Sequence, residues 1–262
     1  MQTIILAGGK GTRMREETEF RPKPMVEVGG FPLLWHVMRI YMHYGYNDFI
    51  IAAGYKAEMI KEFFHNWRAL LYDFSLDTAK GEVNILDKNH VNFKIAILDT
   101  GLETLTGGRI LRCAPYLEGD EFMLTYGDGV SDINLKKVID FHHKQGTLGT
   151  ITGVHPQSKY GLVEVVSKTN LVTRFREKPV LHEYISGGFM VFNRRALEFF
   201  DEGRMEDGLA RLVDNRQLSL FPYEGFWKAV DTYNELEQLN QLWEKERPWA
   251  VWEKNEQKRK SR

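Results

Sequence analysis

The N-terminal stretch, residues 1–30, constrains this chain most, because an apolar run leads directly into a glycine-rich loop. Residues 3–6 read Thr-Ile-Ile-Leu and are rich in β-branched side chains, which predicts a buried strand. Gly8, Gly9 and Gly11 follow, and glycines let a ligand approach backbone amides that no Cβ shields. Successive amides in such a loop form a concavity that binds anions. The stretch therefore predicts a strand that opens onto an anion site.

Two positive charges after the loop favour a polyphosphate as the anion. Arg13 follows the glycines closely, and Lys23 lies between two prolines that hold it on a rigid extended segment. The P-loop pattern is excluded because no Gly-Lys-Ser/Thr closes the loop, and the dinucleotide fingerprint needs a small residue where Met14 stands. The alternative is a tight strand-to-helix turn that is glycine-rich for local reasons alone.

Helical and strand patterns alternate through the first half of the chain. Apolar spacing predicts helices over 32–44 and 56–67, and strands over 48–53, 93–98 and 122–126. This rhythm is typical of a parallel sheet with right-handed crossovers. We expect an α/β fold with one Rossmann-like domain, in which helices flank a mixed, mainly parallel central sheet.

The pattern changes after Gly146, where short strands separated by turns begin. We expect a single domain over 1–252, with a nucleotide-binding half (1–146), an acceptor-binding half (147–252) and a charged tail (253–262). The later elements are predicted as strands over 148–155, 162–166, 171–176, 187–193 and 218–223, and helices over 195–200, 205–213 and 231–243.

Residues 68–92 interrupt the alternation of strands and helices. The segment is polar, shows weak period-two alternation, and is long for a loop in a compact domain. It predicts either a small β lid or hairpin over the site, or a solvated surface hairpin without a role.

Composition excludes several classes of protein. The 262 residues carry a formal net charge of −1, without the basic excess of a nucleic-acid-binding protein. The single cysteine, Cys113, excludes an internal disulfide, and no apolar run approaches membrane-spanning length. We expect a cytoplasmic protein with no nucleic-acid or membrane partner. Trp243, Trp249 and Trp252 crowd the C-terminus, which indicates a buried anchor or a subunit contact, so we also expect a homo-oligomer.

Two further signals for a ligand occur after later strands. Asp128 stands between glycines just after strand 122–126, at the edge where open α/β sheets bind ligands. Asp128 could instead be a turn residue. Gly107, Gly108 and Arg109 open a helix, which indicates that backbone amides face a ligand there.

Several motifs follow one another in a recognisable order. Leu-Ala-Gly-Gly-x-Gly-Thr-Arg with Pro-Lys-Pro precedes Gly-Asp-Gly, Glu-Lys-Pro, Gly-Gly-Phe and Trp-x-x-x-Asp-Thr. Together they resemble the sugar-1-phosphate nucleotidyltransferases, from Met1 to about Trp252. Within that family the chain is most similar to the glucose-1-phosphate cytidylyltransferases. The resemblance implies a Mg²⁺-dependent enzyme that transfers CMP from CTP to glucose 1-phosphate, releases pyrophosphate, and supplies CDP-glucose for polysaccharide biosynthesis.

The resemblance also implies roles in the nucleotide half. Arg13, Lys23 and Asp128 are the expected catalytic residues, with Arg13 at the β- and γ-phosphates and Lys23 near the α-phosphate. Asp128 and Asp231 are the expected metal pair, since Mg²⁺ prefers a couple of carboxylates with phosphate oxygens and water. Asp231 could instead be the cap of the helix that follows it. The expected nucleotide-binding residues are Leu6, Ala7, Gly8, Gly9, Lys10, Gly11, Thr12, Arg13, Lys23, Gly54, Tyr55, Thr104, Gly108, Arg109 and Asp128.

The sugar phosphate is assigned mainly to the second half. Lys178 is expected to bind the acceptor's phosphate, although residues 177–179 could instead be an exposed charged turn. The expected sugar-phosphate-binding residues are Tyr126, Tyr160, Gly161, Glu177, Lys178, Ser186, Gly188 and Trp227.

Two departures from the family pattern lie on the acceptor side. Ser186 stands where relatives tend to have Asn, and Asp207-Gly208 where they tend to have Glu-Pro. Both shorten a polar side chain, so a different phosphorylated acceptor is an alternative. A non-catalytic nucleotide-sugar-binding regulator is a second alternative, disfavoured because Arg13, Lys23 and both aspartates are present.

Overall fold

A mixed sheet runs through the part of the chain that the structure describes. The structure is a computed structural model and describes residues 1–87 and 91–253, with the side chains of Arg13, Arg15 and Glu16 left out. The predicted tail thus lies outside the described residues, apart from Glu253. In spatial order the strands are β13 (Ile185–Ser186), β10 (Gly149–Val154), β14 (Met190–Asn193), β8 (Glu121–Tyr126), β1 (Gln2–Ala7), β4 (Asp48–Ala53) and β7 (Lys94–Asp99), with β15 (Leu218–Tyr223) also paired to β10.

The pairing of these strands confirms the predicted mixed, mainly parallel sheet. β1 is parallel to β4 and β8, β4 is parallel to β7, and β10 is parallel to β15. β14 is antiparallel to β8 and β10, and β13 is antiparallel to β10. The carboxyl ends of β1, β4 and β8 therefore meet at one edge, where open α/β sheets bind their ligands.

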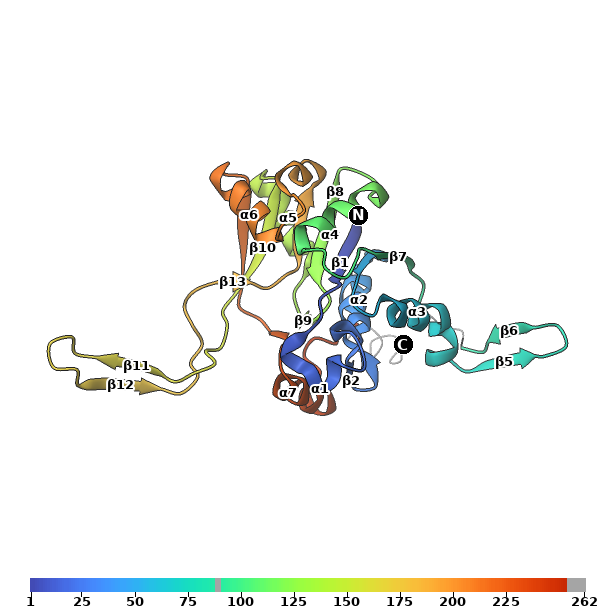
Figure 1. Ribbon diagram of the computed structural model, residues 1–262, viewed down its shortest axis with the longest axis horizontal. Coiled ribbons are helices and arrows are strands. Elements are labelled where there is room, and N and C mark those ends of the chain that lie inside the picture. The colour runs from blue at the N-terminus through green and yellow to red at the C-terminus, as the bar shows by residue number, and fades with distance from the viewer. Residues whose placement is uncertain (88–90, 254–262) are drawn as a thin grey trace, which may run out of the picture.

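Helices cover both faces of the sheet (Figure 1). Successive strand residues point to opposite faces, so Ile5 and Ile51 pack in one hydrophobic cluster while Ile4 and Ile50 pack in another. The first cluster includes residues of α2, α3, α5 and α7, and the second includes residues of α4 and α6. The helices are α1 (Arg15–Thr18), α2 (Leu33–His43), α3 (Ala57–Leu71), α4 (Thr106–Cys113), α5 (Leu135–Gln145), α6 (Met205–Asp214) and α7 (Tyr233–Lys245).

Short 3₁₀ turns and two-stranded pairs complete the described elements. The 3₁₀ turns are η1 (Thr12–Met14), η2 (Lys23–Met25), η3 (Ala114–Tyr116) and η4 (Arg194–Phe199). The paired strands are β2 (Glu27–Val28) with β3 (Phe31–Pro32), β5 (Phe74–Asp77) with β6 (Glu82–Ile85), β9 (Gly129–Ser131) with β16 (Trp227–Ala229), and β11 (Leu162–Val165) with β12 (Val172–Arg176).

The strand predicted over 187–193 is broken in two. Gly188 and Phe189 have positive φ values of 78° and 49°, which no strand accommodates, so pairing stops between β13 and β14. A Cβ on Gly188 would lie 3.1 Å from Oγ1 of Thr125. The helix predicted over 195–200 is the 3₁₀ segment η4.

Two hairpins extend from opposite sides of the body (Figure 1). β5–β6 confirms a hairpin within 68–92, but this hairpin points away from the body. Among the described residues of that segment, none lines the cavities at the sheet edge. The position of a lid over the site is therefore wrong, and the segment is a surface hairpin. The other hairpin, β11–β12, interrupts the acceptor half.

The C-terminal tryptophans form a buried anchor around α2. Trp249 is fully buried, and the rings of Trp243, Trp249 and Trp252 surround His36. Nε2 of His36 donates to the carbonyl oxygen of Val28 at 2.8 Å, and the Trp249 indole donates to Nδ1 at 3.2 Å. The predicted anchor is thus confirmed. Across the described chain, every helix falls short of the length and apolarity that a membrane crossing requires.

Candidate active site

The loop after β1 has a conformation that depends on glycine. Gly11 has a φ of 62°, and a Cβ there would lie 2.6 Å from Cγ2 of Thr18. The Thr18 hydroxyl donates to the carbonyl oxygens of Gly11 and Met14 at 3.0 and 2.9 Å. The first turn after the loop is therefore fixed by contacts that only glycine permits at position 11.

Arg109 fixes the position of the loop through hydrogen bonds. Its side chain is 4% exposed, and its guanidinium donates to the carbonyl oxygens of Ala53 and Gly8 and to Oγ1 of Thr100 at 3.0, 3.0 and 2.5 Å. A Cβ on Gly8 or Gly54 would lie 2.1 or 2.3 Å from its Nη1. Burial lowers the pKa of Arg109 from its ordinary value. These glycines make room for a buried arginine that joins the ends of β1 and β4.

Lys23 links two carboxylates at the same sheet edge. Its Nζ lies 2.6 Å from Oδ2 of Asp128 and 2.7 Å from Oδ1 of Asp231. Burial alone would lower the pKa of Lys23, but the two carboxylates outweigh it and the pKa is raised. Three segments far apart in the sequence thus converge on one ammonium group.

A short two-stranded pair holds the two aspartates side by side. β9 begins just after Asp128 and β16 ends just before Val230, and Gly129 is opposite Ala229 in the ladder. The Val230 amide donates to the Asp128 carbonyl oxygen at 3.0 Å. The spacing of the carboxylates is therefore set by backbone pairing.

The alternative that Asp231 caps α7 is wrong. Thr232 is the cap: its hydroxyl accepts from the Glu235 amide, and the Glu235 carboxylate accepts from the Thr232 amide at 2.8 Å. The same carboxylate accepts from the Asp231 amide at 2.7 Å. The side chain of Asp231 is directed at Lys23 instead.

Two cavities meet at Leu6, Gly9 and Asp128. The larger, of about 760 Å³, is lined by Leu6, Gly8, Gly9, Lys10, Leu102, Glu103, Thr104, Leu105, Thr106, Arg109, Tyr126, Asp128, Arg204 and Glu206. The smaller, of about 330 Å³, is lined by Leu6, Ala7, Gly9, Gly11, Thr12, Lys23, Pro24, Asp128 and Asp231. The two cavities together form a cleft along the loop, and the Lys23 cluster lines the smaller one.

A model of a known protein family decides what kind of protein this is. The family is described as nucleotidyl transferase, and it matches residues 2–246. The chain belongs to this family. The resemblance drawn from the motifs is thereby confirmed.

Relatives of this nucleotidyltransferase include two with near-complete coverage. It is 39% identical over 257 residues to a probable glucose-1-phosphate cytidylyltransferase of Bacillus subtilis (strain 168), over 96% of this chain and 100% of the relative. It is 39% identical over 259 residues to the glucose-1-phosphate cytidylyltransferase of Salmonella typhimurium, over 97% and 100%.

Solved structures share the fold. HddC from Yersinia pseudotuberculosis superposes with a TM-score of 0.67 at 22% identity, over 92% of this chain and 99% of that one. A putative glucose-1-phosphate thymidylyltransferase from Bacillus anthracis gives 0.66 at 16% identity, over 92% and 94%. Both likenesses support the Rossmann-like architecture.

Most predicted nucleotide residues line the cleft of this nucleotidyltransferase. The lining positions from the prediction are Leu6, Ala7, Gly8, Gly9, Lys10, Gly11, Thr12, Lys23, Thr104, Arg109 and Asp128. Within the described chain, Gly54, Tyr55 and Gly108 do not line it. The Tyr55 hydroxyl instead donates to the Thr18 carbonyl oxygen at 3.0 Å, which braces the loop. The Arg13 side chain lies outside the described residues.

The predicted acceptor residues divide into two groups. Tyr126 lines the larger cavity, and burial raises the pKa of its phenol. The Trp227 indole donates to the Gly187 carbonyl oxygen at 2.7 Å, beside Ser186 and Gly188. The second group stands apart on β11–β12 and its flanks: Tyr160, Gly161, Glu177 and Lys178.

Among the described residues, the second group does not line the cleft. Tyr160 is 78% exposed, Lys178 is exposed with a φ of 42°, and Glu177 is exposed. In the described chain, the lining of both cavities omits this group. The described chain therefore brings most of the predicted nucleotide residues to the cleft and leaves this group of predicted acceptor residues out of its lining.

Sequence reasoning missed Arg204 and Glu206, which line the larger cavity from the start of α6. Packing of α6 against α4 brings them there, and the Met205 amide donates to Oγ1 of Thr106 at 2.8 Å. Asp207, expected near the sugar, accepts from the Arg204 amide at 3.2 Å and so caps α6. Only the charged Arg-Met-Glu run at a helix start could have indicated this lining.

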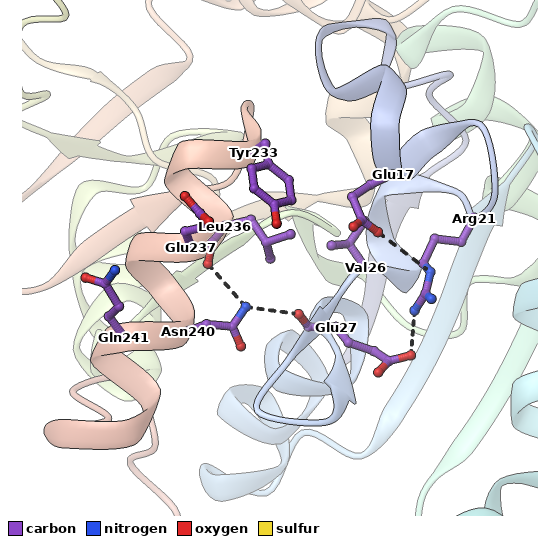
Figure 2. Close-up of a pocket in the computed structure, with 9 residues that line it drawn as sticks. All are labelled: Glu17, Arg21, Val26, Glu27, Tyr233, Leu236, Glu237, Asn240 and Gln241. Atoms are coloured by element: carbon purple, nitrogen blue, oxygen red, sulfur yellow. Dashed lines mark hydrogen bonds and ion pairs between the residues drawn. The ribbon is translucent and has the colours of Figure 1, made fainter.

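A separate cavity of about 430 Å³ lies between α7 and the segment before β2 (Figure 2). Arg21 pairs with Glu27 at 2.5 Å and with Glu17 at 3.9 Å. Asn240 on α7 accepts from the Gly29 amide at 2.9 Å. The hydrogen bond between Gly29 and Asn240 joins the segment that carries Lys23 to α7, the helix that follows Asp231. It therefore helps to hold Lys23 and Asp231 close to each other.

The residues at the cleft fit a divalent cation that uses oxygen ligands. The Asp128 and Asp231 carboxylates already converge on one cationic group. Within the described chain there is no cluster of three or more potential ligands among His, Cys, Asp and Glu. Two carboxylates completed by phosphate oxygens and water are what Mg²⁺ accepts, whereas a structural zinc site needs more protein ligands.

Proposed function

We propose that this nucleotidyltransferase transfers CMP from CTP to glucose 1-phosphate, giving CDP-glucose and pyrophosphate. The observation that carries the proposal is the cluster of Lys23, Asp128 and Asp231 beside the glycine loop. The choice of CTP and glucose 1-phosphate is supported by the cytidylyltransferases that are 39% identical over nearly the whole chain.

The reaction joins two polyanions and requires alignment more than proton transfer. A phosphate oxygen of the sugar phosphate attacks the α-phosphorus, and pyrophosphate leaves in line. The second pKa of a phosphate monoester is about 6, so the nucleophile is already anionic near neutral pH. Neutralising charge and holding the reactants in line are then the main catalytic tasks.

The glycine loop is suited to hold the triphosphate. Its amides lie where the positive φ of Gly11 turns the chain, and Arg109 holds the loop through the Gly8 carbonyl. We assign Arg13, by its position in the sequence, to the β- and γ-phosphates and the departing pyrophosphate. This places positive charge where negative charge accumulates in the transition state.

Asp128 and Asp231 are the proposed holders of Mg²⁺, which when bound neutralises the triphosphate and orients its α-phosphate. Lys23 now lies between these carboxylates. On nucleotide binding, Lys23 exchanges its carboxylate partners for an oxygen of the α-phosphate. The exchange leaves no buried ion unpaired, because the carboxylates would hold the cation and the ammonium would face a phosphate oxygen.

The larger cavity is the proposed base and sugar pocket. Cytosine differs from uracil in its N4 amino donor, which an acceptor atom must meet. The segment 102–106 and the carbonyl groups of the loop line the cavity with acceptors. Its volume of about 760 Å³ is within the range of ordinary small-molecule sites.

A panel assay tests the proposed reaction. The protein is incubated with Mg²⁺, each nucleoside triphosphate in turn, and a series of sugar 1-phosphates, and pyrophosphate release is measured. We expect the largest kcat/KM with CTP and glucose 1-phosphate. Faster release with another acceptor would replace glucose 1-phosphate by that acceptor, which the departure at Ser186 makes the second candidate. No release with any pair would leave the regulator alternative.

A further inference from the structure

Glu206 differs from the charged residues around it, because its carboxylate has no partner in the described chain. Nη2 of Arg112 lies 3.2 Å from Oε2 of Glu202. Nη2 of Arg211 lies 3.0 Å from Oδ2 of Asp201. Glu206 lines the larger cavity from the second position of α6, and among the described residues its carboxylate forms neither an ion pair nor a hydrogen bond. Both of its oxygens can therefore accept hydrogen bonds from a ligand.

The start of α6 is held against the start of α4, so the fold fixes the backbone that carries this carboxylate. The Met205 amide donates to Oγ1 of Thr106 at 2.8 Å. The Gly107 amide donates to the carbonyl oxygen of Gly203 at 2.9 Å. A Cβ on Gly107 would lie 2.7 Å from that carbonyl oxygen, so the two helix ends approach as closely as glycine permits. Ligand contacts built on rigid helices are more precise than contacts built on loops.

A carboxylate at the start of a helix can also serve only to stabilise that helix. In α6, Asp207 already has this role, because its carboxylate accepts from the Arg204 amide at 3.2 Å. The helix α3 offers a comparison, since Glu58 occupies the same second helical position and is exposed, but lines neither cavity of the cleft. Glu58 is therefore a matched control for any effect that Glu206 has on its helix alone.

The neighbours of Glu206 indicate which part of a ligand it faces. Tyr126 lines the same cavity, where burial raises the pKa of its phenol and the negative charge of Glu206 raises that pKa further. Tyr126 ends β8 two residues before Asp128, the proposed holder of the cation that orients the α-phosphate. Glu206 therefore faces the groups on either side of the α-phosphate. These groups are the ribose of the nucleotide and the sugar ring of the acceptor.

Both rings carry neighbouring hydroxyl groups, and a carboxylate can accept from two hydroxyls at once. Other nucleotide-binding folds use an Asp or Glu in this way for a ribose hydroxyl. We propose that Glu206 is a specificity-determining residue of this enzyme, whose carboxylate accepts hydrogen bonds from two neighbouring ring hydroxyls of a bound substrate. The inference rests on the proposed function, and the ring is either the ribose of CTP or the sugar of the acceptor.

Deoxy analogues measure this contact for both rings. Wild type, Glu206→Ala and Glu58→Ala are assayed for pyrophosphate release with CTP or dCTP, and with glucose 1-phosphate or its 2-, 3- and 4-deoxy analogues. We expect Glu206→Ala to lower kcat/KM for the natural pair roughly 30-fold, because hydrogen bonds to a charged group are lost. Removing one contacted hydroxyl should cost wild type about 10-fold and cost Glu206→Ala nothing further. Glu58→Ala should behave as wild type does.

The analogue whose effect disappears in Glu206→Ala identifies the ring. Loss of the difference between CTP and dCTP assigns the contact to the ribose, and loss of the difference for a deoxy sugar phosphate assigns it to the acceptor. Wild-type kcat/KM in Glu206→Ala, or a fall that leaves every deoxy effect at its wild-type size, would overturn the proposal. A change confined to the preference for CTP over UTP would also overturn it, since Glu206 would then contact the base.

Direct binding separates this inference from the proposed reaction. Calorimetric titration with the same nucleotides and sugar phosphates reports the hydroxyl contact without turnover, and circular dichroism checks that each variant is folded. A wild type that releases no pyrophosphate with any pair refutes the proposed function. A dissociation constant that a deoxy analogue raises about 10-fold in wild type, but not in Glu206→Ala, still supports the contact. The same dissociation constants in both proteins for every ligand would refute it.

Discussion

The nucleotide side and the acceptor side of the cleft differ in how completely one chain builds them. On the nucleotide side, a buried arginine, glycines with required conformations and a lysine between two aspartates fix the loop and the proposed metal ligands. On the acceptor side, Glu177 and Lys178 lie exposed at the root of an extended hairpin. Substitutions on the two sides should therefore change different quantities. Those on the nucleotide side should lower kcat or stability, and those on the acceptor side should raise the KM for the sugar phosphate.

The largest effect is expected at the metal pair. Asp128→Asn removes a carboxylate charge but keeps the shape, and kcat should fall by about 10³-fold because charge in the transition state is no longer balanced. The measurement is steady-state pyrophosphate release. The matched control is Asp120→Asn, at an exposed position away from the cleft, which should leave kcat unchanged. Near-normal turnover of the Asp128 variant would refute its role.

The second effect tests how the nucleotide side is held together. Arg109→Met removes a buried guanidinium and its hydrogen bonds to the carbonyl oxygens of Ala53 and Gly8, which keep their backbone donors, the Thr100 and Tyr55 amides. The free energy of unfolding should fall by about 3 kcal/mol, the upper range for a lost hydrogen bond to a charged group. Urea denaturation measures the fall, with Arg195→Met at an exposed position as control. If the KM for CTP is unchanged in the folded variant, Arg109 does not position the loop.

Acid should destabilise the C-terminal tryptophan anchor through His36. Burial lowers its pKa to about 4, and Nδ1 must stay unprotonated to accept from the Trp249 indole. Between pH 6.5 and 4 the unfolded chain binds a proton that the folded chain does not, so the free energy of unfolding falls as pH falls. At pH 5 the loss is about 2 kcal/mol relative to pH 7.5. His36→Gln should start less stable and lose less over this interval; an equal loss would exclude His36 as the cause.

The smallest effect is expected on the acceptor side. Lys178→Ala should raise the KM for the sugar phosphate by about 10-fold, the value of one charge-assisted contact, and leave the KM for CTP unchanged. Lys168→Ala, further along the same hairpin, is the control. If both KM values stay at the wild-type level, Lys178 lies outside the acceptor site. If both rise, the two sides of the cleft are not independent.

Local patterns predicted those parts of the molecule that local contacts determine. The strand predicted over residues 3–6, the helix predicted over residues 32–44 and the position of Asp128 after a buried strand follow from periodicity and from the topology of open sheets. The mixed, mainly parallel sheet and the family membership were also predicted from the sequence. Positive φ at Gly188 was not visible in an apolar run and divided a predicted strand.

The remaining features depend on residues that are distant in the sequence. Whether Asp231 caps a helix or faces a lysine is decided by Lys23, far away in the chain, and by the β9–β16 pair. The motif suggested that Arg109 faces a ligand, whereas its guanidinium reaches carbonyl groups of two other loops. The spacing of apolar residues in a hairpin does not indicate whether the hairpin folds over a site or points away from it.

The ammonium of Lys23 between two aspartates also has a consequence for how the protein matures. An ammonium between the two carboxylates reduces their mutual repulsion when the chain first folds, so folding need not wait for a metal. Protein purified in a chelator should melt at the same temperature as protein kept in Mg²⁺ when no nucleotide is present. Supply of the ion then limits turnover while leaving the amount of folded protein unchanged.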